Sequence, residues 1–306
     1  MGEAGQEGDE ASYQARIRRA FPDLRWSTSR LLTHGCDHDV LLLDERLVFR
    51  FPKRDDYLPR FRAEVRLLAA AGRSLPLAVP QYAYLPPDLD FGGYPLLPGR
   101  ELRPEHVAAM AADARKRIAV QLAQFITALH DLSTEVAVVA GFEHDYWWSQ
   151  SNTAARYELI RPALEPHLNA DEIRWLDEQF AWYLSRHIPQ RAVILHGDLA
   201  PDHLLFDPSR GQLTGIIDFA DVEIGDPAID FAGLWDYGEP FADETLEAYG
   251  GVVDRELRER SRFMGRVLGA EIMYDILQGK TFPESFADGH RRLREAMTRG
   301  GTGTGR

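Results

Sequence analysis

ILHGDLAPDHLLFDPSRGQLTGIID, residues 194–218, is the stretch that decides the fold. Two short apolar segments in it are separated by the turn-forming residues DPSRG, 207–211, and this pattern predicts a β-hairpin. The hairpin would place Asp198, His203 and Asp218 at strand ends, where their side chains can converge. A carboxylate base beside a pair of metal ligands is the arrangement that phosphoryl transfer needs.

Composition limits the class of protein and its partners. The 306 residues are 44% hydrophobic and 27% charged, which suits a sizeable core and two subdomains. No stretch approaches the ~18 uncharged apolar residues of a membrane span, and the acidic N-terminus does not resemble a signal peptide. The single cysteine, Cys36, excludes a disulfide framework, so we expect a cytoplasmic protein. A net charge of −13 argues against a nucleic-acid partner and is compatible with a cationic small molecule.

The order of the predicted elements indicates an α+β chain with two lobes. Strand-like segments and a helix at 57–71 come first, followed by a Gly/Pro-rich passage and then by helices around the hairpin. Apolar residues at a 4-3-4 spacing predict a helix over 105–130, and Asn169 with Glu172 forms a capping-box pattern. The expected boundaries are 1–11 and 299–306 for disordered tails, 12–94 for a β-rich N-terminal lobe, 95–100 for a hinge and 101–298 for a helical C-terminal lobe.

Three motifs in and after the opening stretch resemble those of a known family. His196-Gly197-Asp198, then Asp202-His203, then Ile217-Asp218-Phe219 resemble the signature of the aminoglycoside phosphotransferases, which share the protein-kinase-like fold. The resemblance extends over nearly the whole chain. The details that favour the 2''-phosphotransferase branch are His203, where most relatives carry asparagine, Phe206-Asp207 and Phe51-Pro52-Lys53.

The resemblance implies a role for each polar residue of the hairpin region. Asp198 is the expected catalytic base, which accepts or orients the proton of the acceptor hydroxyl group. Asp218 is expected to bind Mg²⁺, and His203 is expected to be the second protein ligand. Because Mg²⁺ prefers oxygen, His203 could instead hydrogen-bond a water molecule on the metal.

The N-terminal lobe and the hinge are expected to bind the phosphoryl donor, GTP or ATP. Lys53 would contact its phosphates and form an ion pair with Glu64 on the following helix, although an isolated lysine could equally be a surface charge. The loop between the first two strands would cover the phosphates through Gly35, Asp37 and His38. The residues expected around the purine are Tyr94, Pro95 and Leu97 in the hinge, with Leu205 and Ile217 from the other lobe; the last two would equally suit an ordinary core.

Carboxylates after the hairpin are candidates for binding an acceptor that carries ammonium groups, although such residues are often only solvated. The candidate acceptor residues are Asp202, Glu223, Asp236, Glu239, Glu271 and Asp275. Asp226 and Asp230 are expected instead to cap helices or to brace the catalytic loop.

The leading hypothesis from the sequence is a monomeric aminoglycoside phosphotransferase that confers resistance by modifying a 2''-hydroxyl group. A macrolide phosphotransferase or another small-molecule kinase of the same fold is the alternative; the stretch GDPAIDFAG at 225–233 resembles the macrolide family too. A pseudokinase would normally have lost Asp198, Asp218 or Lys53, and all three are present.

Overall fold

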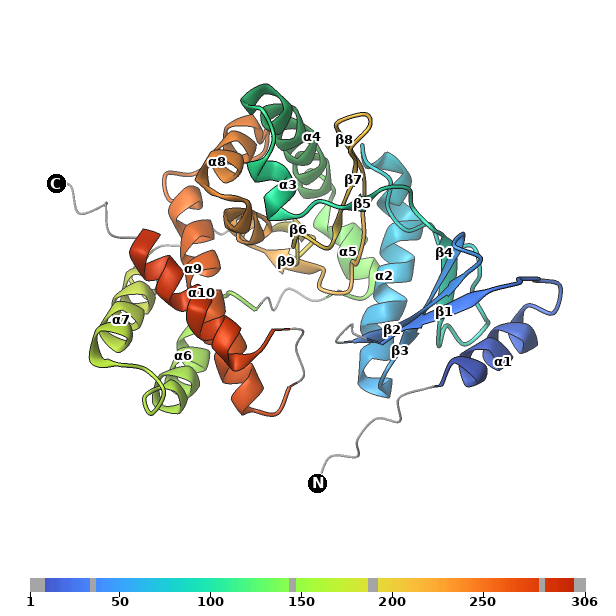
Figure 1. Ribbon diagram of the computed structural model, residues 1–306, viewed down its shortest axis with the longest axis horizontal. Helices are drawn as coiled ribbons and strands as arrows, with labels where there is room; N and C mark the ends of the chain where they lie inside the picture. The colour runs from blue at the N-terminus through green and yellow to red at the C-terminus, as the bar shows by residue number, and fades with distance from the viewer. Residues whose placement is uncertain (1–8, 34–36, 143–146, 187–191, 281–283, 300–306) are drawn as a thin grey trace.

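Two lobes joined by one extended segment make up the molecule (Figure 1). The computed structural model describes residues 9–33, 37–142, 147–186, 192–280 and 284–299. The N-terminal lobe holds a four-stranded sheet, and the C-terminal lobe holds helices around two small sheets. The predicted bilobal α+β class is therefore confirmed.

An antiparallel sheet with a helix against each face forms the N-terminal lobe. Its strand order is β1-β2-β3-β4. These elements are β1 Ser29–Leu32, β2 His38–Leu43, β3 Leu47–Pro52, β4 Gly92–Pro95, α1 Glu10–Ala20 and α2 Leu58–Ala71. Side chains alternate along β3, so Phe49 and Phe51 pack with Tyr13 and Ile17 of α1 while Arg50 points toward α2. Both phenylalanines are fully buried, and truncating either one is expected to cost about 3–5 kcal/mol.

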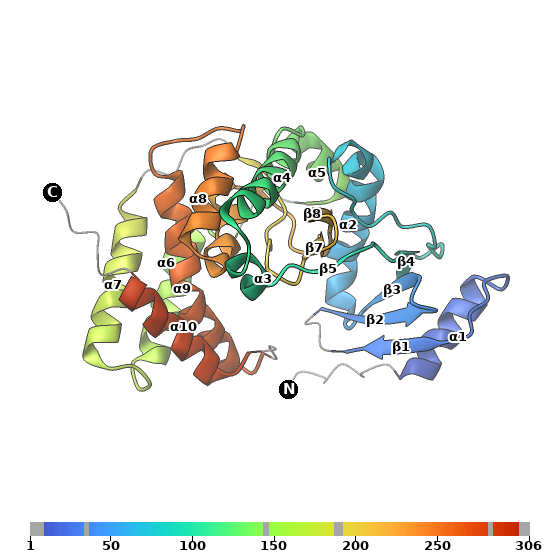
Figure 2. The ribbon, with the colours of Figure 1, turned by 45° about the horizontal axis from the view of Figure 1, so that its top comes forward.

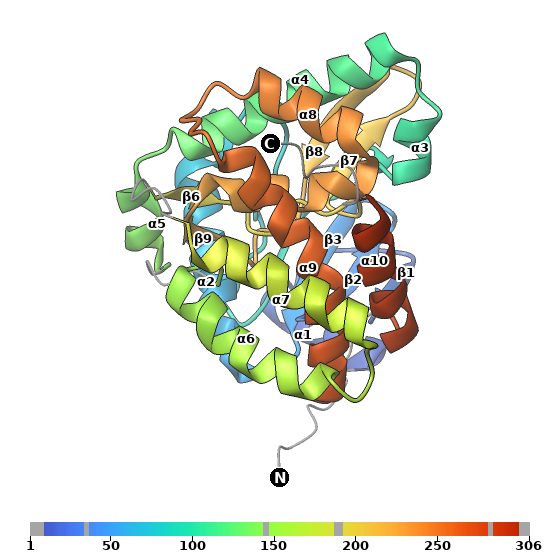
Figure 3. The same cartoon turned by 90° about the vertical axis from the view of Figure 1, so that its left-hand side faces the viewer.

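Most of the C-terminal lobe is helical. Its helices are α3 Pro104–Ala108, α4 Ala112–His130, α5 Thr134–Ala140, α6 Gln150–Leu164, α7 Ala170–Leu184, α8 Glu239–Ala248, α9 Leu257–Leu277 and α10 Phe286–Arg299. Its strands are β5 Arg100–Glu101, β6 Val193–Leu195, β7 Leu204–Asp207, β8 Gln212–Ile216 and β9 Glu223–Gly225. Figure 3 shows α6, α7, α9 and α10 packed together, while α4 and α8 lie alongside each other.

The predicted hairpin is present, and the strand that follows the hinge pairs with it. β7 and β8 pair antiparallel, with Leu204 opposite Ile216 and a register shift between Leu205 and Phe206. β5 adds to the edge of this pair, with Arg100 opposite Phe206. Figure 2 shows the three strands between the N-terminal sheet and the helices of the C-terminal lobe. The hinge therefore connects the N-terminal sheet directly to the hairpin.

Some predicted boundaries differ from the structure. The segment 105–130 contains two helices, α3 and α4, because the apolar stripe that predicted one helix lies wholly within α4. Helix α1 already begins at Glu10, inside the predicted tail, and α10 continues to Arg299. The capping box at the start of α7 is confirmed: Asn169 Oδ1 accepts from the backbone N–H of Glu172 at 3.0 Å, and Glu172 Oε2 accepts from that of Asn169 at 2.8 Å.

A contact between α2 and α5 also ties the two lobes together. Arg66 Nε donates to the backbone carbonyl of Ala140 at 2.7 Å. In the part of the chain that the structure describes, no helix is both long and apolar enough to cross a bilayer.

Candidate active site

The loop that carries Asp198 is held from behind by a buried carboxylate. Asp230, in the 3-10 turn after β9, accepts the backbone N–H groups of His196 and Gly197 at 2.9 Å each. Gly197 has φ +85°, and a Cβ there would lie 2.0 Å from the carbonyl oxygen of Asp221. This position therefore requires glycine. This close contact fixes the position of the backbone that leads into Asp198.

A buried hydrogen-bonded chain supports Asp230 in turn. His130 Nε2, at the end of α4, lies 3.0 Å from Asp230, and His130 Nδ1 lies 2.7 Å from the hydroxyl group of Tyr249. Burial would raise the pKa of Asp230, but its hydrogen bonds with His130 and the loop lower it. Asp226 accepts from the backbone N–H of Ala228 at 3.0 Å and caps the same turn. The predicted capping and bracing roles of the two aspartates are confirmed.

His203 lies between the carboxylates of Asp198 and Asp218. His203 Nδ1 lies 3.4 Å from Asp198 Oδ2, and its Nε2 lies 3.8 Å from Asp218 Oδ2. His203 Nδ1 is also 2.9 Å from the backbone carbonyl of Asp198, which can only accept, so this nitrogen carries a proton. Asp218 has φ +63°, the left-handed region, directly after the hairpin. The hairpin thus brings the three residues together as predicted.

The charges in this group shift one another's pKa values. Burial alone would lower the pKa of His203, but Asp198, Asp218 and Asp202 outweigh it and raise the value to about 9. Burial raises the pKa of Asp198. Burial would also raise the pKa of Asp218, but Arg50 and His203 outweigh it and hold that pKa well below its ordinary value. At neutral pH this leaves a cationic His203 next to an ionised Asp218.

Arg50, and not Lys53, forms the ion pair with Glu64, so the predicted partnership is wrong. Arg50 Nη1 lies 2.8 Å from Glu64 Oε1, and Arg50 Nη2 lies 2.7 Å from Asp218 Oδ1. Arg50 is in the interior of β3 on the side facing α2, whereas Lys53 follows the last residue of that strand. Tyr82 also donates to Glu64 at 3.0 Å. Burial raises the pKa of Glu64 to about 7 in spite of Arg50.

Lys53 instead lies beside the loop that joins β1 to β2. Its Nζ donates to the backbone carbonyl of Thr33 at 2.8 Å and lies 3.5 Å from Asp39 Oδ1. His38, at the start of β2, is buried and accepts a hydrogen bond from Arg50 at 3.2 Å through Nδ1. Burial lowers the pKa of His38 to about 3, so its ring is neutral.

The structure describes the predicted phosphate loop only from Asp37 onward. Gly35 lies outside the described residues. Asp37 lies close enough to Asp218 for the second charge to act on it, and burial together with Asp218 raises the pKa of Asp37. Asp37 and His38 therefore lie near the group formed by Arg50 and Asp218.

The hinge residues meet the hairpin at a glycine. A Cβ on Gly215 would lie 3.3 Å from a side-chain carbon of Leu97 and 3.6 Å from one of Leu205. Tyr94 is buried beside Tyr82 at the end of the sheet, Pro95 is exposed, and Ile217 is half-buried behind His203, whose carbonyl accepts its N–H. Leu97 and Leu205 thus come together from the hinge and the C-terminal lobe, as the predicted purine site requires.

Three of the candidate acceptor carboxylates gather around one arginine and one tryptophan. Arg156 of α6 forms ion pairs with Glu271 and with Asp275, the latter at 3.0 Å. The Arg156 guanidinium lies 4.0 Å from the ring centre of Trp147, whose backbone N–H donates to Glu223 at 2.9 Å. Burial raises the pKa of Glu271 to about 7 despite Arg156. The cluster is therefore acidic but already contains its own cation.

The remaining candidate acceptor residues lie elsewhere. Asp236 forms an ion pair with Arg292 of α10, and Glu239 forms one with Arg262 of α9. Asp202 is 61% exposed and lies 3.9 Å from His203 Nε2. The structure thus divides the six predicted residues among two arginine-paired groups and one exposed aspartate.

Three residues near the site, Arg50, Asp221 and Arg60, were not among the predicted site residues. Asp221 lies beside the loop that carries Asp198, and burial together with Asp198 and Asp218 raises its pKa to about 7 although solvent still reaches the side chain. Arg60 of α2 crosses between the lobes to Asp221 at 3.4 Å and to Glu223 at 3.7 Å. The alternation of β3 was the one signal that could have identified Arg50.

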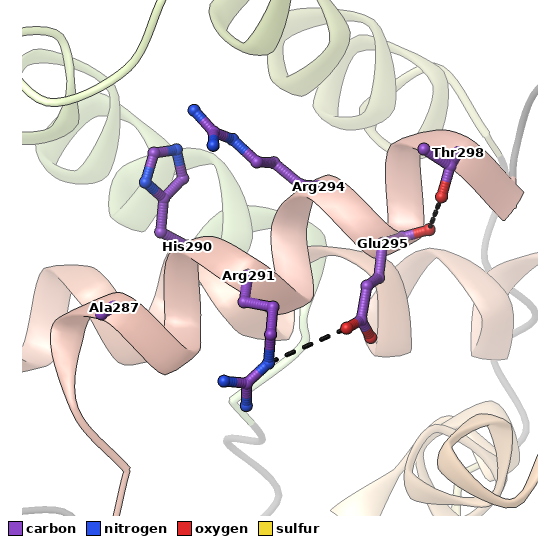
Figure 4. Close-up of a pocket in the computed structure, with 6 residues that line it drawn as sticks. All are labelled: Ala287, His290, Arg291, Arg294, Glu295 and Thr298. Atoms are coloured by element: carbon purple, nitrogen blue, oxygen red, sulfur yellow. Dashed lines mark hydrogen bonds and ion pairs between the residues drawn. The ribbon is translucent and has the colours of Figure 1, made fainter.

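A hollow on the outer face of α10 lies apart from these residues (Figure 4). It has a volume of about 450 Å³, and a single helix supplies all its lining residues. Arg291 pairs with Glu295 at 3.8 Å, while His290 and Arg294 both contact Glu172 of α7. Its charged groups are therefore already paired, either along α10 or with α7.

A sheet lobe and a helical lobe that meet at two aspartates and a histidine are the architecture of a phosphotransferase of the protein-kinase-like fold. The chain belongs to the phosphotransferase enzyme family, whose model matches residues 28–263. The resemblance inferred from the motifs is therefore confirmed, and the chain is an enzyme of the kinase type.

Individual relatives agree with this assignment. The chain is 27% identical to APH(2'')-IIIa in its complex with GDP and kanamycin, with a TM-score of 0.86 over 94% of this chain and 99% of that one. It is 28% identical to an aminoglycoside 3'-phosphotransferase of Streptomyces fradiae over 50% of this chain and 58% of that one. It is 26% identical to the uncharacterized protein YcbJ of Bacillus subtilis (strain 168) over 76% and 77% of the two chains.

Proposed function

We propose that the chain transfers the γ-phosphoryl group of GTP or ATP to a hydroxyl group of an aminoglycoside, with the 2''-hydroxyl as the first choice, and so confers resistance. The observation that carries the proposal is the placement of Asp198 and Asp218 on either side of His203, at 3.4 and 3.8 Å. The likeness to a kanamycin-binding structure supports the substrate class. The reaction belongs in the cytoplasm, where nucleoside triphosphates are made, and one chain supplies every residue it needs.

Asp198 is the proposed base and acts on the acceptor. Its carboxylate accepts or orients the proton of the hydroxyl group as that oxygen attacks phosphorus. Asp230 holds the backbone of the loop, so the carboxylate is positioned before any ligand arrives. Arg50 and Lys53 supply positive charge toward the donor phosphates, with His38 and Asp37 beside them.

Asp218 and His203 fit Mg²⁺ as its two protein ligands. His203 is cationic without a metal, so Mg²⁺ binding would have to displace the proton on Nε2; Nδ1–H would keep its bond to the carbonyl of Asp198, and the Nε2 lone pair would then face Asp218. Such an ion would take its remaining oxygen ligands from phosphates and water. When bound, Mg²⁺ supplies charge neutralisation at the β- and γ-phosphates.

A macrolide phosphotransferase is the second candidate, and one observation favours it. Five of the six predicted acceptor carboxylates have an arginine within 4 Å, at Arg60, Arg156, Arg262 or Arg292, which weakens their attraction for a polycation. A less charged acceptor would lose little from this pairing.

Transfer of labelled phosphate from GTP and from ATP tests the proposal. The acceptors are kanamycin-type and streptomycin-type aminoglycosides and a macrolide. We expect a labelled kanamycin-type product whose formation stops in Asp198→Asn. Labelling of the macrolide alone would reject the aminoglycoside assignment, and labelling of neither class would reject both candidates.

A further inference from the structure

A buried carboxylate on the α1 side of the N-terminal sheet has no role in the mechanism proposed above. Asp39 of β2 is fully buried, and it lies opposite Phe51 of β3 on the face that packs against α1. Its neighbours along that face of β2 are Leu41 and Leu43, which are fully buried as well. A charge among apolar side chains is costly unless it is paired. The partners of Asp39 therefore indicate its role.

Asp39 has a partner in α1 and another just after β3. The hydroxyl group of Tyr13 donates to Asp39 Oδ2 at 2.6 Å, and the ring of Tyr13 stacks on Phe51 with 4.1 Å between the ring centres. Lys53 Nζ lies 3.5 Å from Asp39 Oδ1, the other oxygen of the same carboxylate. Asp39 thus links α1 to the ammonium group of Lys53.

Lys53 in turn holds both ends of the connection between β1 and β2. Its Nζ donates to the backbone carbonyl of Thr33, the residue that follows β1, at 2.8 Å. Its backbone N–H donates to the carbonyl of Asp37, the residue that precedes β2, at 2.9 Å. A displacement of Lys53 would therefore release the start and the end of this connection together.

The end that Lys53 holds next to β2 reaches the group formed by Arg50 and Asp218. Burial and the nearby Asp218 both raise the pKa of Asp37. His38, the next residue, accepts a hydrogen bond from Arg50 at 3.2 Å. Because these residues are proposed above to lie beside the donor phosphates, the position of Lys53 bears on the donor site.

We infer that Asp39 and Tyr13 are positioning residues for the phosphoryl donor. They hold Lys53 against both ends of the connection between β1 and β2. Helix α1 thereby strengthens nucleotide binding, although it packs on the face of the sheet opposite to α2. The inference rests on the proposed nucleotide donor, and it does not depend on which acceptor is phosphorylated.

Calorimetry of GDP and ADP binding to the full chain, with Mg²⁺ present, measures donor affinity without an acceptor. Asp39→Asn removes the charge that faces Lys53, and Tyr13→Phe removes only the hydroxyl group that donates to Asp39. We expect each variant to weaken binding of the nucleotide that the wild type prefers by about three- to tenfold.

A double-variant cycle separates positioning from general stability. Because Asp39 acts through Lys53, Asp39→Asn should weaken binding by less than about twofold in a Lys53→Met background. The matched control is Asp90→Asn, which removes a different link to α1, the ion pair with Arg16 at 2.8 Å, and should bind nucleotide like the wild type. Thermal unfolding checks that each variant is folded at the temperature of the assay.

Each result decides the inference. Weaker binding in both single variants, absent from the control and lost in the Lys53→Met background, supports it. Wild-type affinity in either single variant, an equal effect in the control, or an effect of Asp39→Asn that persists in the Lys53→Met background overturns it. Should Asp39→Asn fail to fold, Tyr13→Phe takes its place in the cycle.

The wild-type chain shows separately whether the proposed function holds. A wild type that binds neither GDP nor ADP would reject the proposed donor and this inference together. A wild type that binds one of them but labels no aminoglycoside would reject the proposed acceptor, and the variants would still decide the inference.

Discussion

Arg50 Nη2 lies 2.7 Å from Asp218 Oδ1, so a side chain of the N-terminal sheet holds a carboxylate of the C-terminal lobe. The same guanidinium contacts Glu64 of α2 at 2.8 Å, and both members of that pair are almost completely buried. Arg50 therefore joins the sheet, α2 and the end of the hairpin. When a nucleotide binds, its phosphates would compete with Asp218 for this guanidinium.

Removing Arg50 should destabilise the fold through Glu64. Arg50→Met leaves a buried carboxylate without its cation, and we expect the free energy of unfolding to fall by about 3–5 kcal/mol. Glu64→Gln added to that variant should restore part of the loss. Urea unfolding of the single and double variants measures both effects.

An exposed ion pair provides the control for that experiment. Arg30 lies 3.5 Å from Glu45, and more than half of each side chain is exposed, so Arg30→Met should cost less than about 1 kcal/mol. An equal loss in the free energy of unfolding for Arg50→Met and Arg30→Met would show that the buried pair has no special structural role.

Replacing Asp198 should reduce turnover and spare nucleotide binding. Asp198→Asn keeps the shape of the side chain but cannot take a proton, so kcat should fall by about 10²–10⁴-fold. The affinity for GDP, measured by calorimetry, should stay within about twofold. Asp207→Asn, in the turn of the hairpin, should leave both quantities unchanged; a wild-type kcat in Asp198→Asn would remove Asp198 from its proposed role.

Removing Arg60 should improve the binding of a cationic acceptor. Arg60 lies near Asp221 and Glu223, so Arg60→Ala frees two carboxylates for ammonium groups. We expect KM for kanamycin to fall by about three- to tenfold with little change in kcat. Arg62→Ala, on the same helix but bound to backbone carbonyls, is the control. A higher KM in Arg60→Ala would mean that Arg60 itself supports the acceptor.

Glu271 should make stability depend on pH between 4.5 and 7. Its pKa is raised to about 7 by burial, so the folded chain holds this proton more tightly than the unfolded chain. The resulting stability is fully present below pH 4.5 and is lost as the pH rises through 7, by up to about 3 kcal/mol.

A glutamine at position 271 has no proton to lose. Glu271→Gln should therefore flatten the pH dependence measured by urea unfolding from pH 4.5 to pH 8, while Glu259→Gln, on the more exposed part of α9, should not. Identical slopes for wild type and Glu271→Gln would show that Glu271 titrates normally in the fold.

Local patterns were enough to predict the hairpin and the group around His203. The turn residues and the flanking apolar segments lie within one short stretch, so the positions of Asp198 and Asp218 followed from the turn itself. The capping box at Asn169 is equally local, and it too is confirmed.

Partners from distant segments could not be read in the same way. Choosing Arg50 over Lys53 requires knowing that α1 covers the face of β3 with Phe49 and Phe51, which leaves the other face for α2. The cations beside the acceptor residues come from α2, α6, α9 and α10, and sequence spacing does not show which acid each one meets.

The contact between Gly197 and Asp221 limits which part of the site can move. With no space for even one carbon atom between the two segments, Asp198 and Asp221 belong to one rigid body anchored in the C-terminal lobe. Arg50 and Lys53 belong to the other body. If the lobes tilt, the residues proposed for the phosphoryl donor would move against those proposed for the acceptor, and variants that loosen the hinge should alter donor preference before they alter which hydroxyl group is modified.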